Sequence, residues 1–206
     1  EIYAGTLKYF ELPIPTSEAT ALTVTDLSAP RTSYMLSKIV GEAMVHQSGL
    51  PFTIFRPHNI YGPRMGMVHV IPEQLQNAYQ ATAGDSLQVY SPNHTRTFCY
   101  IDDAVEMLQR MLTCEGCNGE TLNLGRQAPE VTIRDVVEAC INISGKLLRI
   151  EERPPTPGSP ERRAPDMQKT DQLLGYKPRF GLHQGIEKTW TWYYEHVFTR
   201  QGVTLK

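Results

Sequence analysis

The sequence predicts an α/β protein, and three observations lead to that prediction. Apolar residues recur every three or four positions in several stretches, as they do along the buried face of a helix. Short apolar runs typical of strands separate these stretches. The first helical pattern leads through a turn directly into one such run, "GLPFTIFRP", which is expected to form a short buried strand. A helix followed by a buried strand is the arrangement of half a βαβ unit in a parallel sheet.

The first quarter of the chain contains one helix between two strand-like segments. Residues 1–5, "EIYAG", have the pattern of a strand end, and a loop rich in Pro, Ser and Thr follows. A helix is expected over residues 28–48, where Pro30 suits the first turn and Thr32 and Ser33 resemble capping residues. The wide apolar stripe of this helix consists of Met35, Leu36, Ile39, Val40, Ala43 and Met44.

The rest of the chain continues the alternation of helices and strands. Helices are expected over 68–84, 102–113, 132–145, 169–178 and 181–197, and strands over 86–91, 96–101, 120–125 and 147–153. The expected boundary residues are Pro72 and Gly84 for the first of these helices, Asp102 or Asp103 for the second, and Thr132 and Gly145 for the third. A Pro-rich loop follows the last of these strands.

Composition narrows the class of protein. The 206 residues are 40% hydrophobic and 20% charged, as in a soluble globular chain with one sizeable domain or two small ones. A net charge of −2 gives no reason to expect a nucleic acid or a membrane as partner. No apolar run approaches the roughly 20 residues that span a bilayer. The first residues do not resemble a signal peptide, so we expect a cytoplasmic protein.

The four cysteines do not form a disulfide framework, which agrees with a reducing compartment. Cys114 and Cys117 have the C-x-x-C spacing, but two further zinc ligands at similar spacing do not follow. The pair also follows a helical run, whereas a redox motif is expected at a strand-to-helix turn. We interpret the two residues as loop thiols; bound metal or thiol titration at this pair would indicate a metal or redox module instead.

Tyr34 and Lys38, in "SYMLSK", are four residues apart and therefore share one face of the expected helix. A phenol ordinarily loses its proton near pH 10, too high for a base at neutral pH. A positive charge about 4 Å away favours the anion by roughly 4 kcal/mol, or about 3 pKa units. A tyrosine tuned in this way could take a proton from a sugar or alcohol hydroxyl while a hydride leaves to a cofactor.

Five ordered segments extend this pair to most of the chain: "EIYAG", "SYMLSK", "RPHNIYGP", "RTFCYIDD" and "RRAPD". With the closing segment "FGLHQGIEKTWTWYYEH", the set resembles the extended short-chain dehydrogenase/reductase family, specifically its NAD-dependent nucleotide-sugar epimerases and dehydratases. The resemblance implies that Tyr34 is the catalytic acid/base and that Lys38 also holds the nicotinamide ribose of NAD. It implies a weaker, branch-dependent acid/base role for Glu1, which is otherwise a strand-end residue. The family's hydroxyl residue would precede Glu1.

The same resemblance assigns the other ligand contacts. Pro57 and His58 would lie near the nicotinamide, and Asn59 would bind the phosphate region of a nucleotide sugar. His58 could titrate near neutrality, although a structural or substrate-contacting role is favoured over a catalytic one. The remaining implied substrate contacts are Val89 and Tyr90 beside the base, Arg96 and Arg163 on the diphosphate, and Asp166 on the ribose. Guanidinium groups suit a diphosphate because they donate paired hydrogen bonds.

The family's Gly-rich phosphate loop, G-x-x-G-x-x-G, does not occur in these 206 residues. The chain therefore resembles the C-terminal two-thirds of a family member. The expected fold is the C-terminal part of a Rossmann-type parallel sheet (residues 1–60) plus a smaller α/β substrate-binding domain (residues 61–206), with 96–125 returning to the Rossmann domain. We expect these residues alone neither to bind NAD well nor to catalyse.

The favoured activity is that of an NAD-dependent nucleotide-sugar epimerase, because no further catalytic acid beyond Glu1 is visible. The alternatives are a 4,6-dehydratase or decarboxylase of the same family, or a non-catalytic nucleotide-binding regulator. An Asp just before Glu1 would favour a dehydratase, and a Ser or Ala an epimerase. The resemblance also implies a homodimer formed through the Tyr34 helix, whose wide apolar stripe would allow it.

Overall fold

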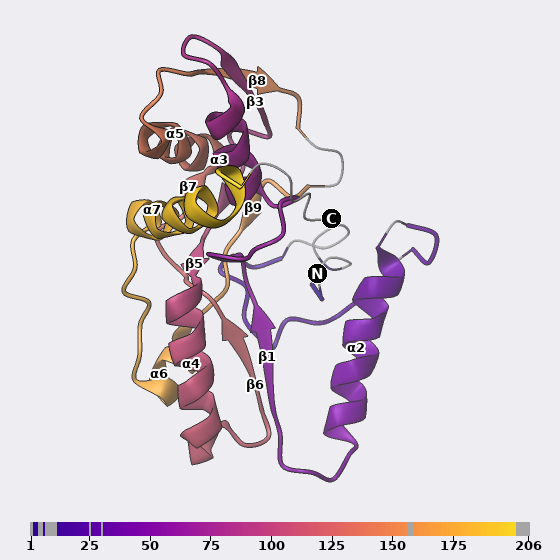
Figure 1. Cartoon of the computed structure of the whole chain (residues 1–206). Helices are drawn as coiled ribbons and strands as arrows, with labels where there is room; N and C mark the ends of the chain where they lie inside the picture. Colours follow the sequence, from indigo (N-terminus) through magenta and orange to yellow (C-terminus); the bar gives the residue numbers. More distant parts are fainter. Residues whose placement is uncertain are drawn as a thin grey trace.

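A computed structural model describes residues 2–3, 6, 12–24, 26–29, 31–155 and 159–200 (Figure 1). The helices are α2 (Thr32–His46), α3 (Val70–Gln80), α4 (Ile101–Thr113), α5 (Ile133–Ser144), α6 (Gln168–Leu174) and α7 (Leu182–Tyr193), with a 3₁₀ turn at Glu115–Cys117 and a π-helical turn at Tyr194–Phe198. The strands are β1 (Thr53–Pro57), β2 (Ile60–Tyr61), β3 (Ser86–Tyr90), β4 (Thr95–Arg96), β5 (Cys99–Tyr100), β6 (Glu120–Leu124), β7 (Val131–Thr132), β8 (Arg149–Arg153) and β9 (Arg162–Arg163).

Parallel pairing dominates the described strands. β1 pairs with β6, β2 with β5 and β3 with β8, all in parallel, while β4 joins the antiparallel β7 to the parallel β9. Long crossovers that contain helices connect these parallel pairs, as geometry requires. The prediction of an α/β fold with parallel strands is confirmed.

The elements gather into two groups (Figure 1). In one group β1 and β6 lie side by side, with α2 on one side and α4 and α6 on the other. In the other group α3, α5 and α7 pack with β3 and β8. The chain passes from the first group to the second after β1, returns for α4 and β6, and leaves again at β7. It returns once more for α6 before it reaches α7.

Three apolar clusters form the core of these groups, one in the first group and two mainly in the second. Met107, Leu122 and Met167 join α4, β6 and the segment before α6. Residues of α3, α5 and α7 form the second cluster with the rings of Tyr61 and Tyr100. In this second cluster α7 approaches closely because residue 185 is glycine, since an added Cβ would clash with the ring of Tyr61. The third cluster packs α3 and α5 against β3 and consists of Ala78, Leu87, Val89, Val137 and Ile141.

The expected capping residues were right at α5 and wrong at two other helices. Thr132 and Asp135 form a reciprocal capping box at the start of α5, and Gly145 ends it in a left-handed conformation. Helix α2 instead begins after Arg31, and the hydroxyl of Thr32 donates to the carbonyl of Asp26, 2.7 Å away, rather than capping. Pro30 lies outside the described residues.

Helix α4 begins after Tyr100, so neither expected aspartate is its N-cap. Asp103 is fully buried and accepts hydrogen bonds from the hydroxyl of Tyr176 and the backbone N–H groups of Arg179 and Phe180. Helix α3 ends at Gln80, before the expected stop at Gly84. The aspartate that looked like a local cap therefore anchors a distant loop.

The strand expected to be buried, β1, is buried only at Arg56, and Phe55 is 48% exposed. Within the described residues β1 pairs with β6 along one edge only. The apolar run in "TIFRP" therefore predicted the strand correctly but not its surroundings.

Candidate functional site

Tyr34 and Lys38 lie on one face of α2, one turn apart. The ammonium of Lys38 is 5.0 Å from the centre of the Tyr34 ring, and both side chains are exposed. Within the part of the chain that the structure describes, the contacts of Tyr34 and Lys38 stay within α2. The hydroxyl of Ser37 donates to the backbone carbonyl of Tyr34 at 2.7 Å. An exposed phenol beside an ammonium is free to meet a ligand hydroxyl.

His58 and Asn59 follow the carboxyl end of β1, the edge at which ligands bind in open parallel sheets. The His58 Nε2 atom is 2.9 Å from Oδ1 of Asn123 on β6. Burial lowers the pKa of His58 to about 4, although the hydrogen bond with Asn123 opposes that shift. His58 is therefore neutral at pH 7, and the expected titration near neutrality is wrong.

Asn59 adopts a left-handed backbone conformation (φ 43°) and donates from its amide to the carbonyl of Thr97 at 2.9 Å. Asparagine tolerates this conformation better than most residues. Pro57, the last residue of β1, is exposed. These residues form a short turn where β1 leads toward the second group of elements.

Arg96 and Arg163 occupy paired positions on the neighbouring parallel strands β4 and β9, which places their side chains on the same face. Arg96 is only 7% exposed, and its guanidinium donates to three backbone carbonyls and to the hydroxyl of Ser159, 3.1 Å away. All four acceptors are neutral, so they leave its charge uncompensated. Burial, followed by repulsion from Arg163, lowers the pKa of Arg96 to about 10.

A cavity of about 820 Å³ opens between α3 and β3 and reaches Arg96. Three of the expected substrate residues line it, namely Val89, Tyr90 and Arg96, together with Ser91 and Ser159. Val89 is buried, and Tyr90 is 54% exposed. The guanidinium of Arg96 at this cavity, with Arg163 on the neighbouring strand close enough to lower its pKa, suits an anion with several oxygens.

This cavity is not lined by Asp166, Tyr34 or Lys38. The carboxylate of Asp166 accepts a hydrogen bond from the N–H of Gln168 at 2.9 Å. The backbone carbonyl of Asp166 accepts one from the side-chain amide of Asn123 at 3.0 Å. Arg162, the neighbour of Arg163 in the sequence, has no expected role; it is exposed and pairs with Glu130 through atoms 2.5 Å apart. Tyr34 and Lys38 make no recorded contact with Arg96 or Arg163 in the described part of the chain, and Glu1 lies outside that part.

The C-x-x-C pair sits in the 3₁₀ turn after α4. Cys117 is fully buried, and burial, followed by its contact with Cys114, raises the pKa of its thiol to about 11. The Cys114 thiol donates to the carbonyl of Leu173 at 3.5 Å. The described residues contain no group of three or more His, Cys, Asp or Glu side chains placed to hold a metal ion. They also contain no helix long and apolar enough to cross a membrane.

The sequence interpretation missed a buried polar network near the carboxyl ends of β1 and β6. Arg56 donates through two nitrogens to both carboxylate oxygens of Glu42 on α2, at 2.9 and 2.7 Å, and to the hydroxyl of Tyr3 at 2.7 Å. The Tyr3 hydroxyl in turn lies 3.2 Å from Oδ1 of Asn123. An arginine and an asparagine inside the apolar runs "TIFRP" and "ETLNLG" were the available signals.

A second missed residue is Gln74 on α3, which lines the cavity and is only 6% exposed. Its side-chain oxygen is buried without a hydrogen-bond partner. Its polar nature among the apolar positions Ile71, Leu75 and Ala78 was the only sequence signal.

Comparison with known proteins defines the class. Residues 2–125 match the NAD dependent epimerase/dehydratase family. The chain belongs to this family, whose members are nucleotide-sugar epimerases, dehydratases and decarboxylases of the extended short-chain dehydrogenase/reductase type. NAD is the cofactor of the family.

Particular relatives agree with that class. The chain is 32% identical over 165 residues to UDP-glucuronic acid decarboxylase 5 of Arabidopsis thaliana, covering 76% of this chain and 46% of that protein. It is 30% identical over 203 residues to dTDP-glucose 4,6-dehydratase 1 of Escherichia coli, covering 90% and 55%. The chain thus spans about half the length of the curated relatives it matches.

A solved structure has the same fold. The crystal structure of UDP-glucuronic acid 4-epimerase from Bacillus cereus, in complex with UDP-glucuronic acid and NAD, aligns with a TM-score of 0.71 at 24% identity. The alignment covers 88% of this chain and 59% of that one. The neighbours in this comparison are Rossmann-fold NAD-dependent epimerases and dehydratases, which confirms the expected fold class.

Proposed function

We propose that the protein oxidises and re-reduces C4 of a nucleotide-diphosphate sugar with NAD, and that Tyr34 is the acid/base. The observation that supports this proposal best is the buried guanidinium of Arg96, which lines the cavity and lies on the strand beside Arg163. A buried guanidinium whose acceptors are all neutral favours an anion as ligand. A diphosphate supplies that anion, and both curated relatives named above act on nucleotide sugars by name.

The residues present fit NAD as cofactor. The phenol of Tyr34 and the ammonium of Lys38 are exposed on one helix face, where they can meet a hydroxyl and a ribose. Bound NAD supplies the acceptor and later the donor of a hydride. Pro57 and His58 are proposed beside the nicotinamide, where the neutral imidazole of His58 adds no positive charge.

Tyr34 moves the proton. As phenolate it accepts the proton of the sugar's C4 hydroxyl, and as phenol it returns that proton when the carbonyl is reduced. Lys38 stabilises the phenolate because its ammonium lies beside the ring. Asn59, Arg96, Arg163 and Asp166 hold the nucleotide in this proposal, so that the sugar remains between α2 and the turn after β1.

The division of the chain follows from these roles. We propose that residues 1–60, together with 96–125, belong to the NAD-binding domain, and that the remainder of 61–206 binds the nucleotide sugar. The parallel pair β1–β6 with its flanking helices supports the first part, and the cavity between α3 and β3 supports the second.

Two branches of the reaction differ in what happens before the hydride returns. The epimerase branch returns it to the other face of the sugar and requires no further acid. The decarboxylase and dehydratase branches lose carbon dioxide or water first, and the names of the two curated relatives favour these branches. A mass decrease in the product separates them, because epimerisation leaves the mass unchanged. A non-catalytic regulator would release every nucleotide sugar unaltered.

Replacing Tyr34 by Phe in the full-length protein tests the catalytic role. The change removes one hydroxyl from an exposed position, so folding is expected to persist, while turnover of UDP- or dTDP-sugars falls by at least about 100-fold. Product is followed by chromatography and mass spectrometry, with Ser33→Ala on the same helix as the control. Undiminished turnover by the phenylalanine variant would remove Tyr34 from the mechanism.

A further inference from the structure

Gln74 differs from every other buried residue of α3 because it is polar and its side-chain oxygen has no partner. The buried residues of α3 are Ile71, Pro72, Gln74, Leu75 and Ala78. Oε1 of Gln74 is enclosed and accepts no hydrogen bond within the described protein. A buried amide oxygen in this state destabilises the fold, and leucine at the same position would avoid that cost. The fold alone therefore gives no reason for a glutamine here.

The cavity gives such a reason. Gln74 lines it from α3, opposite Val89 and Ser91 at the end of β3, and Arg96 lines the same space. A glutamine amide offers one acceptor and one donor side by side. A ligand anchored by its phosphates at Arg96 and extending between α3 and β3 would bring a further polar group to that amide.

We propose that Gln74 recognises the base of the nucleotide. When the terminal amide turns toward the cavity, Oε1 accepts from N3–H of a uracil or thymine ring, and the amide nitrogen donates to the neighbouring carbonyl of the ring. This assignment rests on the proposed function, because it takes the phosphates to lie at Arg96 and Arg163. Uracil and thymine are chosen because both present an N–H flanked by carbonyl oxygens, which matches an amide that needs a donor.

The test must isolate the N3–H contact, because an amide can turn over and pair with cytosine as well. Isothermal titration calorimetry of the full-length protein is therefore carried out with UDP and with 3-methyl-UDP, which lacks the N3 hydrogen. The variants are Gln74→Leu and, as a matched control on another face of the same helix, Gln76→Leu. Gln76 does not line the cavity.

Wild type and Gln76→Leu are expected to bind UDP about tenfold or more tightly than 3-methyl-UDP. Gln74→Leu is expected to bind UDP about tenfold more weakly than wild type, and to distinguish the two ligands by less than about threefold. Its Tm without ligand should equal or exceed that of wild type, since the substitution removes a buried oxygen without a partner.

The outcomes separate this inference from the proposed function. If wild type does not bind UDP, dTDP is titrated next, followed by GDP, ADP and CDP. Binding of a purine or cytidine diphosphate but of neither UDP nor dTDP overturns only the assignment of Gln74, and binding of none of the five overturns the proposed nucleotide-sugar function as well. If wild type binds UDP and Gln74→Leu binds it equally well, only the assignment of Gln74 fails. Equal losses for UDP and 3-methyl-UDP, or a Tm several degrees below wild type, would mean that Gln74 acts through packing and would also overturn the assignment.

Discussion

Burial in the folded protein sets the ionisation of His58 more than its neighbours along the chain do. A histidine after a strand, such as His58, would ordinarily titrate near pH 6.5. Its burial after the carboxyl end of β1 lowers the pKa to about 4, and the amide oxygen of Asn123 remains its hydrogen-bond partner. A neutral ring at this position keeps extra positive charge away from the proposed nicotinamide site.

The lowered pKa of His58 predicts an acid-dependent loss of stability. The unfolded chain binds a proton at His58 below about pH 6.5, whereas the folded protein does so only below about pH 4. This contribution to the unfolding free energy is therefore fully present above pH 6.5 and is lost as the pH falls to 4, by up to about 3 kcal/mol.

Denaturant titrations of wild type and His58→Gln between pH 7 and 4.5 measure this contribution. The free energy of unfolding should fall more steeply with acid for wild type, since the variant lacks the titrating ring. Parallel pH profiles for the two proteins would contradict the lowered pKa. His183→Gln, at an exposed position on α7, serves as the control.

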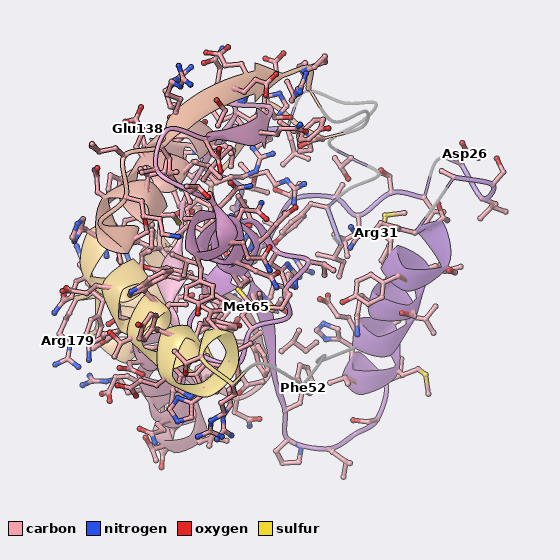
Figure 2. All side chains as sticks on the ribbon, turned by 45° about the horizontal axis from the view of Figure 1, so that its top comes forward. Asp26, Arg31, Phe52, Met65, Glu138 and Arg179 are labelled. Atoms are coloured by element: carbon pink, nitrogen blue, oxygen red, sulfur yellow. The ribbon has the colours of Figure 1, made fainter. Side chains whose placement is uncertain are left out.

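At the level of elements, α2 is held against β1 by one ion pair on the same helix face as the proposed catalytic residues. Tyr34, Lys38 and Glu42 recur at steps of four, so they share that face. Arg56 on β1 holds Glu42 through two hydrogen bonds, with side chains only 9% and 14% exposed. Figure 2 labels Arg31 where α2 begins and Phe52 where the chain enters β1, near the opposite end of the helix.

We expect the Glu42–Arg56 pair to position Tyr34. Glu42→Ala leaves a buried guanidinium without its carboxylate and should lower the free energy of unfolding by about 3 kcal/mol. The double variant Glu42→Leu/Arg56→Met should recover most of that stability, because apolar residues often replace buried ion pairs without loss. The double variant should nevertheless have a lower kcat than wild type at nearly unchanged KM, because the arginine pair proposed to bind the nucleotide is separate.

Denaturant unfolding and steady-state kinetics on the full-length protein check this prediction. The partly exposed pair Glu106–Arg110 on α4, with atoms 2.7 Å apart, provides the comparison. Glu106→Ala should cost less than about 1 kcal/mol and leave the kinetics unchanged. Wild-type kcat in the stabilised double variant would show that the pair is only structural.

At the scale of the whole molecule, one side of α2 presents a row of exposed apolar side chains. Leu36, Val40 and Met44 recur at steps of four and are 37%, 47% and 69% exposed. The notion of a homodimer formed through this helix remains a proposal, and this apolar row supports it because such rows are typical of surfaces between proteins.

Sedimentation of the full-length protein tests this proposal. Wild type should sediment as a dimer at micromolar concentration, and Val40→Glu/Met44→Glu as a monomer, because two charges would be buried at the interface. Leu112→Glu, at an 88% exposed position on α4, should remain dimeric. A monomeric wild type would refute the proposed interface.

The sequence alone determined the order of helices and strands, the α/β class and the capping box at Thr132. It also placed Tyr34 and Lys38 on one helix face. These features depend on residues within a few positions of one another, and local periodicity encodes them. The ordered motifs identified the family for the same reason, because each motif is a short local pattern.

Only the tertiary structure decided which distant residues meet. It paired Arg96 with Arg163, joined Arg56 to Glu42, tied His58 to Asn123 and enclosed Gln74 in a cavity wall. It also exposed Phe55 in a strand expected to be buried, and turned Asp103 from an expected cap into an anchor for the loop before α7. Such contacts depend on strand pairing and helix packing across long stretches of chain, and short-range patterns in the sequence do not specify these.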